Sequence, residues 1–246
     1  MSWFKKWFNS PLYEKLYANR NESEAKLLAD LIEKKVPKST HSKLLDLGCG
    51  RGRHSITFAG RGYQVKGIDL SEAAIATAKK RAHKNKAYHT RFGIRDMREP
   101  LNETFDAILN LFTTFGYFLD DNENQRILKS AGCMLRKDGI FVIDFLNANQ
   151  VKINLKPCDN GIYESLEYSI ERFIEDGMVH KTITFTGPEL EEPVEYTERV
   201  KLYDKSWFEK NLSETGFEIS CICGDYHGND FDEQTSPRLL MFSRKL

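Results

Sequence analysis

The stretch KLLDLGCGRGRHS, residues 43–55, carries glycines at positions 48, 50 and 52 directly after a short apolar run. An apolar run of this length that stops at glycine is typical of a buried parallel strand, and the residues after the glycines tolerate a helix. Glycine admits a positive φ and leaves no Cβ in the way of a ligand. The stretch therefore predicts a strand, a tight turn and a helix, with a ligand held at the start of the helix.

Asp46 lies two residues before the first glycine of this turn. A dinucleotide-binding turn has the spacing G-x-G-x-x-G/A, and its amides cradle a pyrophosphate at the helix N-terminus. Here the third glycine comes one residue early, and a carboxylate would repel phosphate oxygens in a partly dry crevice. The turn therefore favours a cationic ligand over a diphosphate, which argues against a nicotinamide oxidoreductase.

Length, composition and charge limit the architecture and the partners. The chain has 246 residues, of which 40% are hydrophobic, so it suffices for one α/β domain with an elaboration or a small cap. Basic and acidic residues both total 36, so the formal net charge is zero and a nucleic-acid polymer is a disfavoured partner. The five scattered cysteines favour a reducing, cytoplasmic compartment and show no metal-ligand spacing, so we expect no bound metal. The sequence contains no apolar run that could span a bilayer, and we expect no membrane partner.

Residues 43–144 alternate between strand and helix patterns. Strands are expected within 43–47, 63–68, 88–94, 105–111 and 139–145, and helices at 71–84 and 121–136. A helix at 206–215 and strands at 217–223 and 238–244 follow near the C-terminus. Repeated units of this kind predict an α/β fold with a doubly wound, mostly parallel seven-stranded sheet.

Two regions stand outside this pattern. Tyr13–Val36 has apolar residues at helical spacing and predicts a helical leader. Residues 162–203 alternate aromatic and β-branched side chains, broken at Asp176-Gly177, and predict antiparallel hairpins. We therefore expect a main domain of residues 1–149 and 205–246, with an inserted antiparallel β cap at 150–204.

Further motifs follow the second and third expected strands. Asp69 ends the second strand, where an acid can accept hydrogen bonds from a ribose diol or simply cap the next helix. Together with Asp46-x-Gly48-x-Gly50-x-Gly52, with Asp96-Met97 and with FDAILNLFTTFGYF at 105–118, it resembles class I S-adenosylmethionine-dependent methyltransferases. The leader WFNSPLYEKLYANRNESEA at 7–25 resembles a bacterial group of small-molecule N- and O-methyltransferases within that class, which implies that residues 1–37 form a lid over the cofactor.

The resemblance implies S-adenosyl-L-methionine as cofactor, S-adenosyl-L-homocysteine as product and a small-molecule methyl acceptor. In the family, an acid such as Asp96 meets the adenine amino group, its neighbour Met97 packs on the ring, and an arginine such as Arg20 pairs with the methionyl carboxylate. This chain has Arg20-Asn21 where the family commonly has Arg-Asp, so a role for Asn21 stays open. The implied cofactor-binding residues are Tyr17, Arg20, Asp46, Gly48, Cys49, Gly50, His54, Asp69, Leu70, Asp96, Met97, Asn110 and Leu111.

Methyl transfer from a sulfonium requires an aligned nucleophile and a dry site, and few catalytic groups. Candidates to orient or deprotonate the acceptor are Tyr13, Tyr117 and His227. Candidates to contact it are Phe112, Phe115, Arg199 and Tyr226. The acidic run at 189–195 would favour a cationic or amine acceptor, or would be a solvated loop.

Two alternative functions stay open. A sensor or scaffold could bind S-adenosylmethionine without transferring the methyl group. A protein or nucleic-acid methyltransferase would share the fold, although one acting on base amino groups has a D/N-P-P-Y/F-like element where this chain has Asn110-Leu-Phe-Thr. The sequence is compatible with a monomer or a homodimer.

Overall fold

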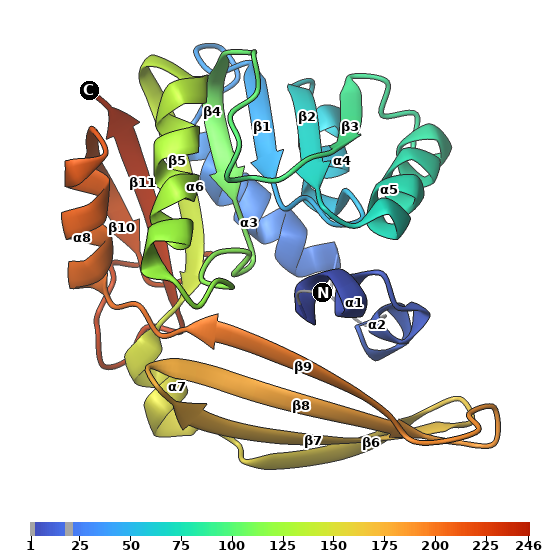
Figure 1. The fold of residues 1–246 in the computed structure, drawn as a ribbon. Helices are drawn as coiled ribbons and strands as arrows, with labels where there is room; N and C mark the ends of the chain where they lie inside the picture. The colour runs from blue at the N-terminus through green and yellow to red at the C-terminus, as the bar shows by residue number, and fades with distance from the viewer. Residues whose placement is uncertain (1–2, 18–21) are drawn as a thin grey trace.

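The computed structural model describes residues 3–17 and 22–246, and its larger sheet has seven strands in the order β10-β11-β5-β4-β1-β2-β3 (Figure 1). Strands β1 to β5 pair in parallel, whereas β11 runs antiparallel to both β5 and β10. The mostly parallel seven-stranded sheet predicted from the sequence is thus confirmed. The strands are β1 (Lys43–Leu47), β2 (Gln64–Asp69), β3 (Thr90–Ile94), β4 (Phe105–Asn110), β5 (Leu135–Leu146), β10 (Phe217–Cys223) and β11 (Arg238–Lys245).

Helices cover both faces of this sheet. Leu28 of α3 (Glu22–Lys35) and Phe58 of α4 (Arg53–Gly60) belong to one buried apolar cluster, on one face. Leu128 of α6 (Asp121–Met134) and Phe208 of α8 (Lys205–Glu214) belong to a second cluster, on the other face. Helix α5 (Glu72–Lys84) packs with α3 and α4, since its Ala82 belongs to the first cluster. This arrangement leaves the carboxyl ends of β1, β2 and β4 as the place where a ligand can approach.

Local capping residues explain where several helices begin. The side chain of Ser71 accepts a hydrogen bond from the Ala74 amide at 3.1 Å, which confirms the cap expected for α5. Asp204 accepts one from the Trp207 amide at 2.8 Å, so α8 begins at Lys205 rather than at Ser206. Strand β5 begins at Leu135, four residues before the predicted start, because its first residues pair with Phe105.

A second sheet has four antiparallel strands in the order β6-β7-β8-β9 (Figure 1). Its strands are β6 (Cys158–Tyr163), β7 (Leu166–Glu175), β8 (Met178–Thr186) and β9 (Val194–Lys201). Asp176 and Gly177 have φ angles of 49° and 69° and form the turn between β7 and β8, as the hairpin prediction requires. The short helix α7 (Ala148–Asn154) and strand β6 were not predicted.

The N-terminal leader differs from the prediction of helix from Tyr13 onward. Two short helices, α1 (Trp3–Phe8) and α2 (Pro11–Leu16), precede α3. Ser10 caps α2, and Pro11 occupies its first turn, so the chain changes direction there. The lid helices, α1 and α2, lie between the two sheets (Figure 1), where Trp7 is fully buried in a cluster with Ile183. None of the helices in the described residues is long and apolar enough to cross a membrane.

Candidate active site

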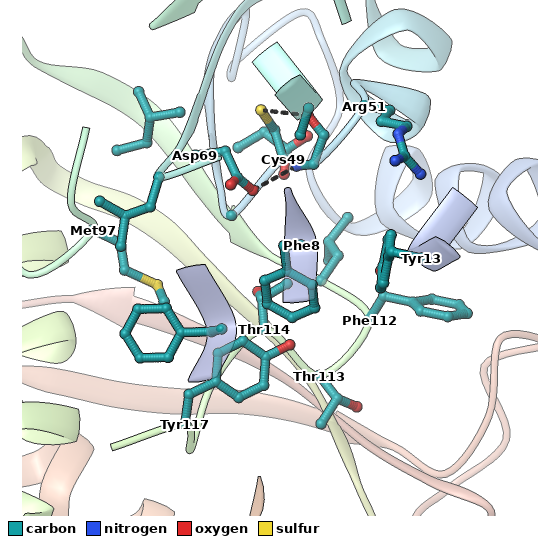
Figure 2. Close-up of a pocket in the computed structure, with 18 of the residues that line it drawn as sticks. Phe8, Tyr13, Cys49, Arg51, Asp69, Met97, Phe112, Thr113, Thr114 and Tyr117 are labelled. Atoms are coloured by element: carbon teal, nitrogen blue, oxygen red, sulfur yellow. Dashed lines mark hydrogen bonds between the residues drawn. The ribbon is translucent and has the colours of Figure 1, made fainter. Parts of the chain in front are cut away.

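A cavity of about 630 Å³ opens at the carboxyl ends of β1, β2 and β4. The large sheet contributes one side and the lid helices with β9 contribute the other. Figure 2 shows Asp69 and Cys49 on one side of this cavity and Tyr117 and Thr113 on the opposite side. The cavity therefore joins segments from the start, the middle and the end of the chain.

The glycine turn, residues 48–52, has the backbone that the sequence predicted. Gly48, Gly50 and Gly52 have φ angles of 69°, 53° and 74°. A Cβ placed on Gly50 would meet no protein atom within 4 Å, so the space in front of it is open. A Cβ on Gly52 would lie 2.8 Å from the Phe92 ring. Gly50 thus admits a ligand, whereas Gly52 is required for packing.

The carboxylate of Asp69 lies at the tip of β2 and is held by backbone amides. Its Oδ2 accepts a hydrogen bond from Gly50 N at 2.9 Å, and its Oδ1 accepts one from Ser71 N at 2.8 Å. Burial raises the pKa of this carboxyl, and the amide hydrogen bonds oppose that rise. An ionised carboxylate accepts about four hydrogen bonds, so Asp69 retains acceptor capacity toward the cavity.

Asp46 and His54 form the buried floor beneath the glycine turn. Asp46 accepts a hydrogen bond from Ser55 Oγ at 2.5 Å, and burial raises its pKa to about 6. His54 is 8% exposed, and its Nε2 has no hydrogen-bond partner among the described residues. Burial, with a smaller effect of Arg53, lowers the pKa of His54 to about 3. The imidazole is therefore neutral at physiological pH and offers an unused polar atom at the cavity.

Aromatic side chains form most of the opposite side. The aromatic wall comprises Trp3, Phe4 and Phe8 of α1, Tyr13 and Tyr17 of the α2 segment, and Tyr117 and Phe118 after β4. The Tyr117 ring lies 5.2 Å from that of Trp3 and 5.8 Å from that of Phe8. Tyr13 lies 5.1 Å from Phe8, so the wall is continuous.

Glu198 of β9 ties the lid helices to the second sheet. Its carboxylate accepts hydrogen bonds from Trp7 Nε1 at 2.6 Å and from the Tyr17 hydroxyl at 2.7 Å. Lys181 of β8 lies 3.3 Å from the same carboxylate and also contacts the Tyr17 hydroxyl. We call Trp7, Tyr17, Lys181 and Glu198 the Glu198 cluster. It joins the N-terminal residues Trp7 and Tyr17 to strands β8 and β9, more than 160 positions away in the sequence. Tyr17 and Glu198 of this cluster also line the cavity.

The charges that line the cavity are balanced. Four acidic side chains (Glu14, Asp46, Asp69 and Glu198) and four arginines (Arg51, Arg53, Arg81 and Arg95) line it. Arg51 and Glu14 form an ion pair at 2.5 Å, and the Arg53 guanidinium lies 4.7 Å from the Phe112 ring centre. Such a lining suits a ligand that carries charges of both signs more than a strongly anionic one.

Most of the residues predicted from the sequence for the site lie in this lining. They are Tyr13, Tyr17, Asp46, Gly48, Cys49, Gly50, His54, Asp69, Leu70, Met97, Leu111, Phe112 and Tyr117. Tyr17 follows α2 and lines the cavity, and its hydroxyl donates a hydrogen bond to Glu198. Arg20 and Asn21 lie outside the described residues, so their roles stay predictions.

Two of the predicted cofactor residues lie beside the cavity and do not line it. Asp96 forms an ion pair with Arg98 at 2.5 Å. Asn110 donates a hydrogen bond from its side-chain amide to the Leu47 carbonyl at 3.2 Å, and its Oδ1 is buried without a partner among the described residues. Their partners here, Arg98 and Leu47, do not line the cavity either.

The structure places the other four predicted residues away from the cavity lining. Phe115 is fully buried against Phe145 and Phe208, because the chain turns back into the core after β4. Arg199 follows Glu198 on β9, so its side chain points to the opposite face of the sheet. In the acidic run at 189–195, Glu189, Glu191 and Glu192 lie in the exposed connection between β8 and β9, and Glu195 is exposed on β9.

Tyr226 and His227 lie in the connection between β10 and β11. Tyr226 is buried and donates its hydroxyl hydrogen bond to Asp144 at 2.8 Å. His227 is exposed, and its amide binds Asp225. We therefore assign neither of them, and neither Phe115 nor Arg199, to direct contact with the acceptor.

Sequence reasoning missed the residues of α1 and β9. Trp3, Phe4 and Phe8 line the cavity, and Trp7 packs on the second sheet. Their i, i+4 spacing was a usable signal, since Trp3 and Trp7, and likewise Phe4 and Phe8, stand four residues apart on a short helix. Glu198 had no such signal, because a charged residue on a strand is ordinary until its partners are known.

Comparison with known proteins gives the same class of domain. A family model of a methyltransferase domain matches residues 44–139. A dTDP-3-amino-3,4,6-trideoxy-alpha-D-glucopyranose N,N-dimethyltransferase from Streptomyces venezuelae is 28% identical over 55% of this chain and 56% of its own length. A glycine/sarcosine N-methyltransferase from Aphanothece halophytica is 23% identical over 77% of this chain and 73% of its own length.

The solved structures show a similar fold over nearly the whole chain. A crystal structure of an S-adenosylmethionine-dependent methyltransferase from Clostridium acetobutylicum ATCC 824 superposes with a TM-score of 0.82. It is 19% identical and covers 95% of this chain and 96% of that one. The chain contains a methyltransferase domain, and these findings confirm the resemblance drawn from the motifs at 46–52, 69 and 96–97.

Proposed function

We propose that the chain, a class I S-adenosylmethionine-dependent methyltransferase, transfers a methyl group to an amino nitrogen of a small molecule. The observation that carries the proposal is a single cavity of about 630 Å³ that has the glycine turn on one side and the aromatic wall on the other. That volume lies in the range of small-molecule sites. The two relatives named above are N-methyltransferases, which supports nitrogen over oxygen as the acceptor atom.

The glycine turn and Asp69 fit the cofactor. The open space in front of Gly50 admits a ligand against the backbone, and Asp69 has acceptor capacity for a ribose diol. Met97 lines the cavity and can pack on a flat ring. Asp46 and the aromatic wall both favour positive charge, which suits the amino group and the sulfonium.

The acceptor would lie between the aromatic wall and the glycine turn. Tyr13 and Tyr117 line that space and are the candidates to orient an amine by hydrogen bonding from their hydroxyl groups. Phe112 lines the same space. Of the four acceptor contacts predicted from the sequence, it is the one in the cavity lining. We propose that the lid at 1–37 excludes water and that the cap at 150–204 selects the acceptor.

Few groups of the chain need to take part in the chemistry. When bound, S-adenosylmethionine supplies a methyl group on a positively charged sulfur, so that a nitrogen–carbon bond forms as the sulfur–carbon bond breaks. The chain would have to align the acceptor nitrogen with the methyl group and exclude water from the cavity. The amine arrives with its lone pair free, and the methylated ammonium loses its extra proton to solvent after release. With a pKa of about 3, His54 is a poor general base at neutral pH.

The cellular setting is also part of the proposal. The five cysteines are free, which fits a reducing cytoplasm.

The oligomeric state and the acceptor class are further parts of the proposal. We expect a monomer or a homodimer in solution. A small-molecule acceptor rather than a nucleic acid is supported by the balanced charge of the cavity and of the whole chain.

The test is a turnover assay with matched acceptors. The enzyme is incubated with S-adenosylmethionine and pairs of compounds that differ only in an amino or a hydroxyl group, including amino sugars and amino acids. We expect S-adenosylhomocysteine to form with at least one amine and the amine to gain 14 mass units per methyl group, as mass spectrometry measures. The Tyr117→Phe variant should turn over the same amine more slowly, because it lacks the orienting hydroxyl.

The outcomes separate the alternatives. Methylation of the hydroxyl partner alone would replace nitrogen by oxygen as the acceptor atom. Binding of S-adenosylmethionine with no S-adenosylhomocysteine formed from any acceptor, including protein and RNA, would favour a sensor or scaffold. Methylation of protein or RNA alone would contradict a small-molecule acceptor.

A further inference from the structure

The chain at the end of β4 has an unusual backbone next to the cavity. Phe112 and Thr113 both have φ angles of 60°, and neither is glycine. Positive φ is unfavourable for a β-branched residue such as threonine, and two such residues in succession persist only where their surroundings impose them. Both residues line the cavity. The conformation of this segment therefore requires a cause in the structure around it.

That cause is a buried group of polar residues behind the segment. Asp144 of β5 is fully buried, and its Oδ2 accepts a hydrogen bond from Phe112 N at 2.8 Å. The backbone oxygen of Asp144 accepts a second one from Thr113 N at 3.0 Å. A single residue of the neighbouring strand thus binds the amides of both residues that have positive φ.

Two further side chains hold Asp144 and Thr113 in place. Arg238 of β11 donates from Nε to Asp144 Oδ1 at 2.8 Å and from Nη2 to Thr113 Oγ1 at 2.9 Å. Tyr226 donates its hydroxyl hydrogen bond to Asp144 Oδ2 at 2.8 Å. We call Asp144, Tyr226 and Arg238 the Asp144 network. Among the described residues, none of its three members lines the cavity, and the network contacts the lining at Phe112 and Thr113.

The segment reaches the cofactor side of the cavity through Phe112 and the residue that follows the segment, Thr114. The Phe112 ring lies 6.2 Å from the His54 ring and packs under the Arg53 guanidinium. Thr114 donates from Oγ1 to the Leu47 carbonyl at 3.3 Å, and its Cβ would lie 3.0 Å from a Cβ placed on Gly48. Residues 112–114 therefore pack directly against the glycine turn and its helix.

We propose that the Asp144 network imposes the positive-φ conformation of Phe112 and Thr113 and thereby shapes the cofactor side of the cavity. Asp144, Tyr226 and Arg238 are then positioning residues, which act on cofactor binding from behind the β4 end. The proposal rests on the cofactor site and does not depend on which acceptor the enzyme uses. It also gives Tyr226 a role different from the acceptor contact predicted from the sequence.

The test uses two buried tyrosines of the same apolar cluster as a matched pair. Tyr226→Phe removes one hydrogen bond from Asp144, whereas Tyr63→Phe removes the hydrogen bond that Tyr63 donates to the Val36 carbonyl at 2.8 Å. Calorimetric titration with S-adenosylhomocysteine measures affinity, and hydrogen exchange measures the amides of residues 112 and 113. We expect Tyr226→Phe to weaken binding about 5-fold and to speed that exchange about 10-fold. Tyr63→Phe should change both by less than 2-fold, although both variants should lower the unfolding temperature.

A second-site variant provides a readout that a merely structural role would not give. Asparagine adopts positive φ more readily than threonine, so Thr113→Asn should restore most of the affinity lost by Tyr226→Phe. Equal affinities for Tyr226→Phe and Tyr63→Phe, or no recovery with Thr113→Asn, would overturn the proposal. If the wild-type enzyme failed to bind S-adenosylhomocysteine, the assignment of the cofactor site would fail instead. The exchange at residues 112 and 113 would still decide whether the network holds the segment.

Discussion

The two sides of the cavity are built in different ways. On the cofactor side, the glycine turn and Asp69 come from neighbouring strands that follow each other in the chain, and their amides and carboxylate bond to one another locally. On the lid side, Trp7 and Glu198 lie 191 positions apart, and Ser10 bonds to Tyr196 across 186 positions. The cofactor side is therefore encoded in short motifs, whereas the lid side exists only after the lid helices and the second sheet have docked.

The difference predicts separate responses to mutation. Changes on the cofactor side should lower ligand affinity, because these residues line the cavity and are expected to contact the ligand. Changes on the lid side should loosen residues 3–17 and leave the cofactor contacts of the glycine turn in place. The four variants below test this separation, in order of decreasing expected effect.

Asp69→Ala should have the largest effect. It removes a carboxylate that orders the Gly50 amide and is expected to bind the ribose, and hydrogen bonds to a charged group contribute about 1.5–3 kcal/mol. We expect the affinity for S-adenosylhomocysteine to fall by about 10- to 100-fold in calorimetric titration. Asp204→Ala is a matched control, since Asp204 also accepts a backbone hydrogen bond at a helix start and lies far from the cavity lining. An affinity within 2-fold of wild type for Asp69→Ala would remove Asp69 from the cofactor site.

Glu198→Ala should have the next largest effect, on the lid. It removes the carboxylate that Trp7, Tyr17 and Lys181 contact, and the Glu198 and Lys181 side chains are less than one-fifth exposed, so we expect the free energy of unfolding to fall by about 2 kcal/mol. Hydrogen exchange of residues 3–17 should become faster, while the affinity for S-adenosylhomocysteine should fall less than in Asp69→Ala. Glu195→Ala, an exposed residue on the opposite face of the same strand, is the control. Unchanged exchange in the lid helices would show that the Glu198 cluster does not hold them.

Asp46→Asn, on the cofactor side, should change the free energy of unfolding in a pH-dependent way. The folded-state pKa of about 6 lies above the ordinary value of 3.8, so the native state binds more protons between these values and stability falls as pH rises through them. Removing the charge should therefore raise the free energy of unfolding by about 1–2 kcal/mol at pH 8 and by almost nothing at pH 4. Denaturant titrations at the two pH values measure this. A variant less stable than wild type at pH 8 would contradict the buried-charge interpretation.

Tyr17→Phe should have the smallest effect. It removes the hydroxyl that bonds to Glu198 but leaves the Trp7 and Lys181 contacts of that carboxylate, so we expect a loss of about 0.5–1 kcal/mol of stability. The affinity for S-adenosylhomocysteine should change by less than 3-fold. A larger loss of affinity would show that Tyr17 contacts the cofactor, as the family resemblance implies, and would weaken the distinction between the two sides.

The sequence by itself determined the parts of the protein that depend on local backbone chemistry. The apolar run before glycine, the positive φ of Gly48, Gly50 and Gly52, and the acid at the tip of β2 follow from residues that are neighbours in the chain. Parallel strands bring their carboxyl ends to one edge, so Asp46, Asp69 and Met97 could be placed at one site before any coordinates. The hairpins of the second sheet followed from alternation and from the Asp176-Gly177 turn.

Only the tertiary structure decided which side chains face the cavity from the other regions. Phe115 and Phe112 lie three residues apart in one aromatic segment, yet one is in the core and the other lines the cavity, because the backbone turns at positive φ between Leu111 and Thr114. Tyr226 donates its hydroxyl hydrogen bond to Asp144, and Glu198 accepts a hydrogen bond from Tyr17, next to the lid helices. The partners in these hydrogen bonds are separated by 82 and 181 positions in the sequence. Such contacts form only when distant helices and strands dock, so no hydrophobic periodicity in the sequence predicts them.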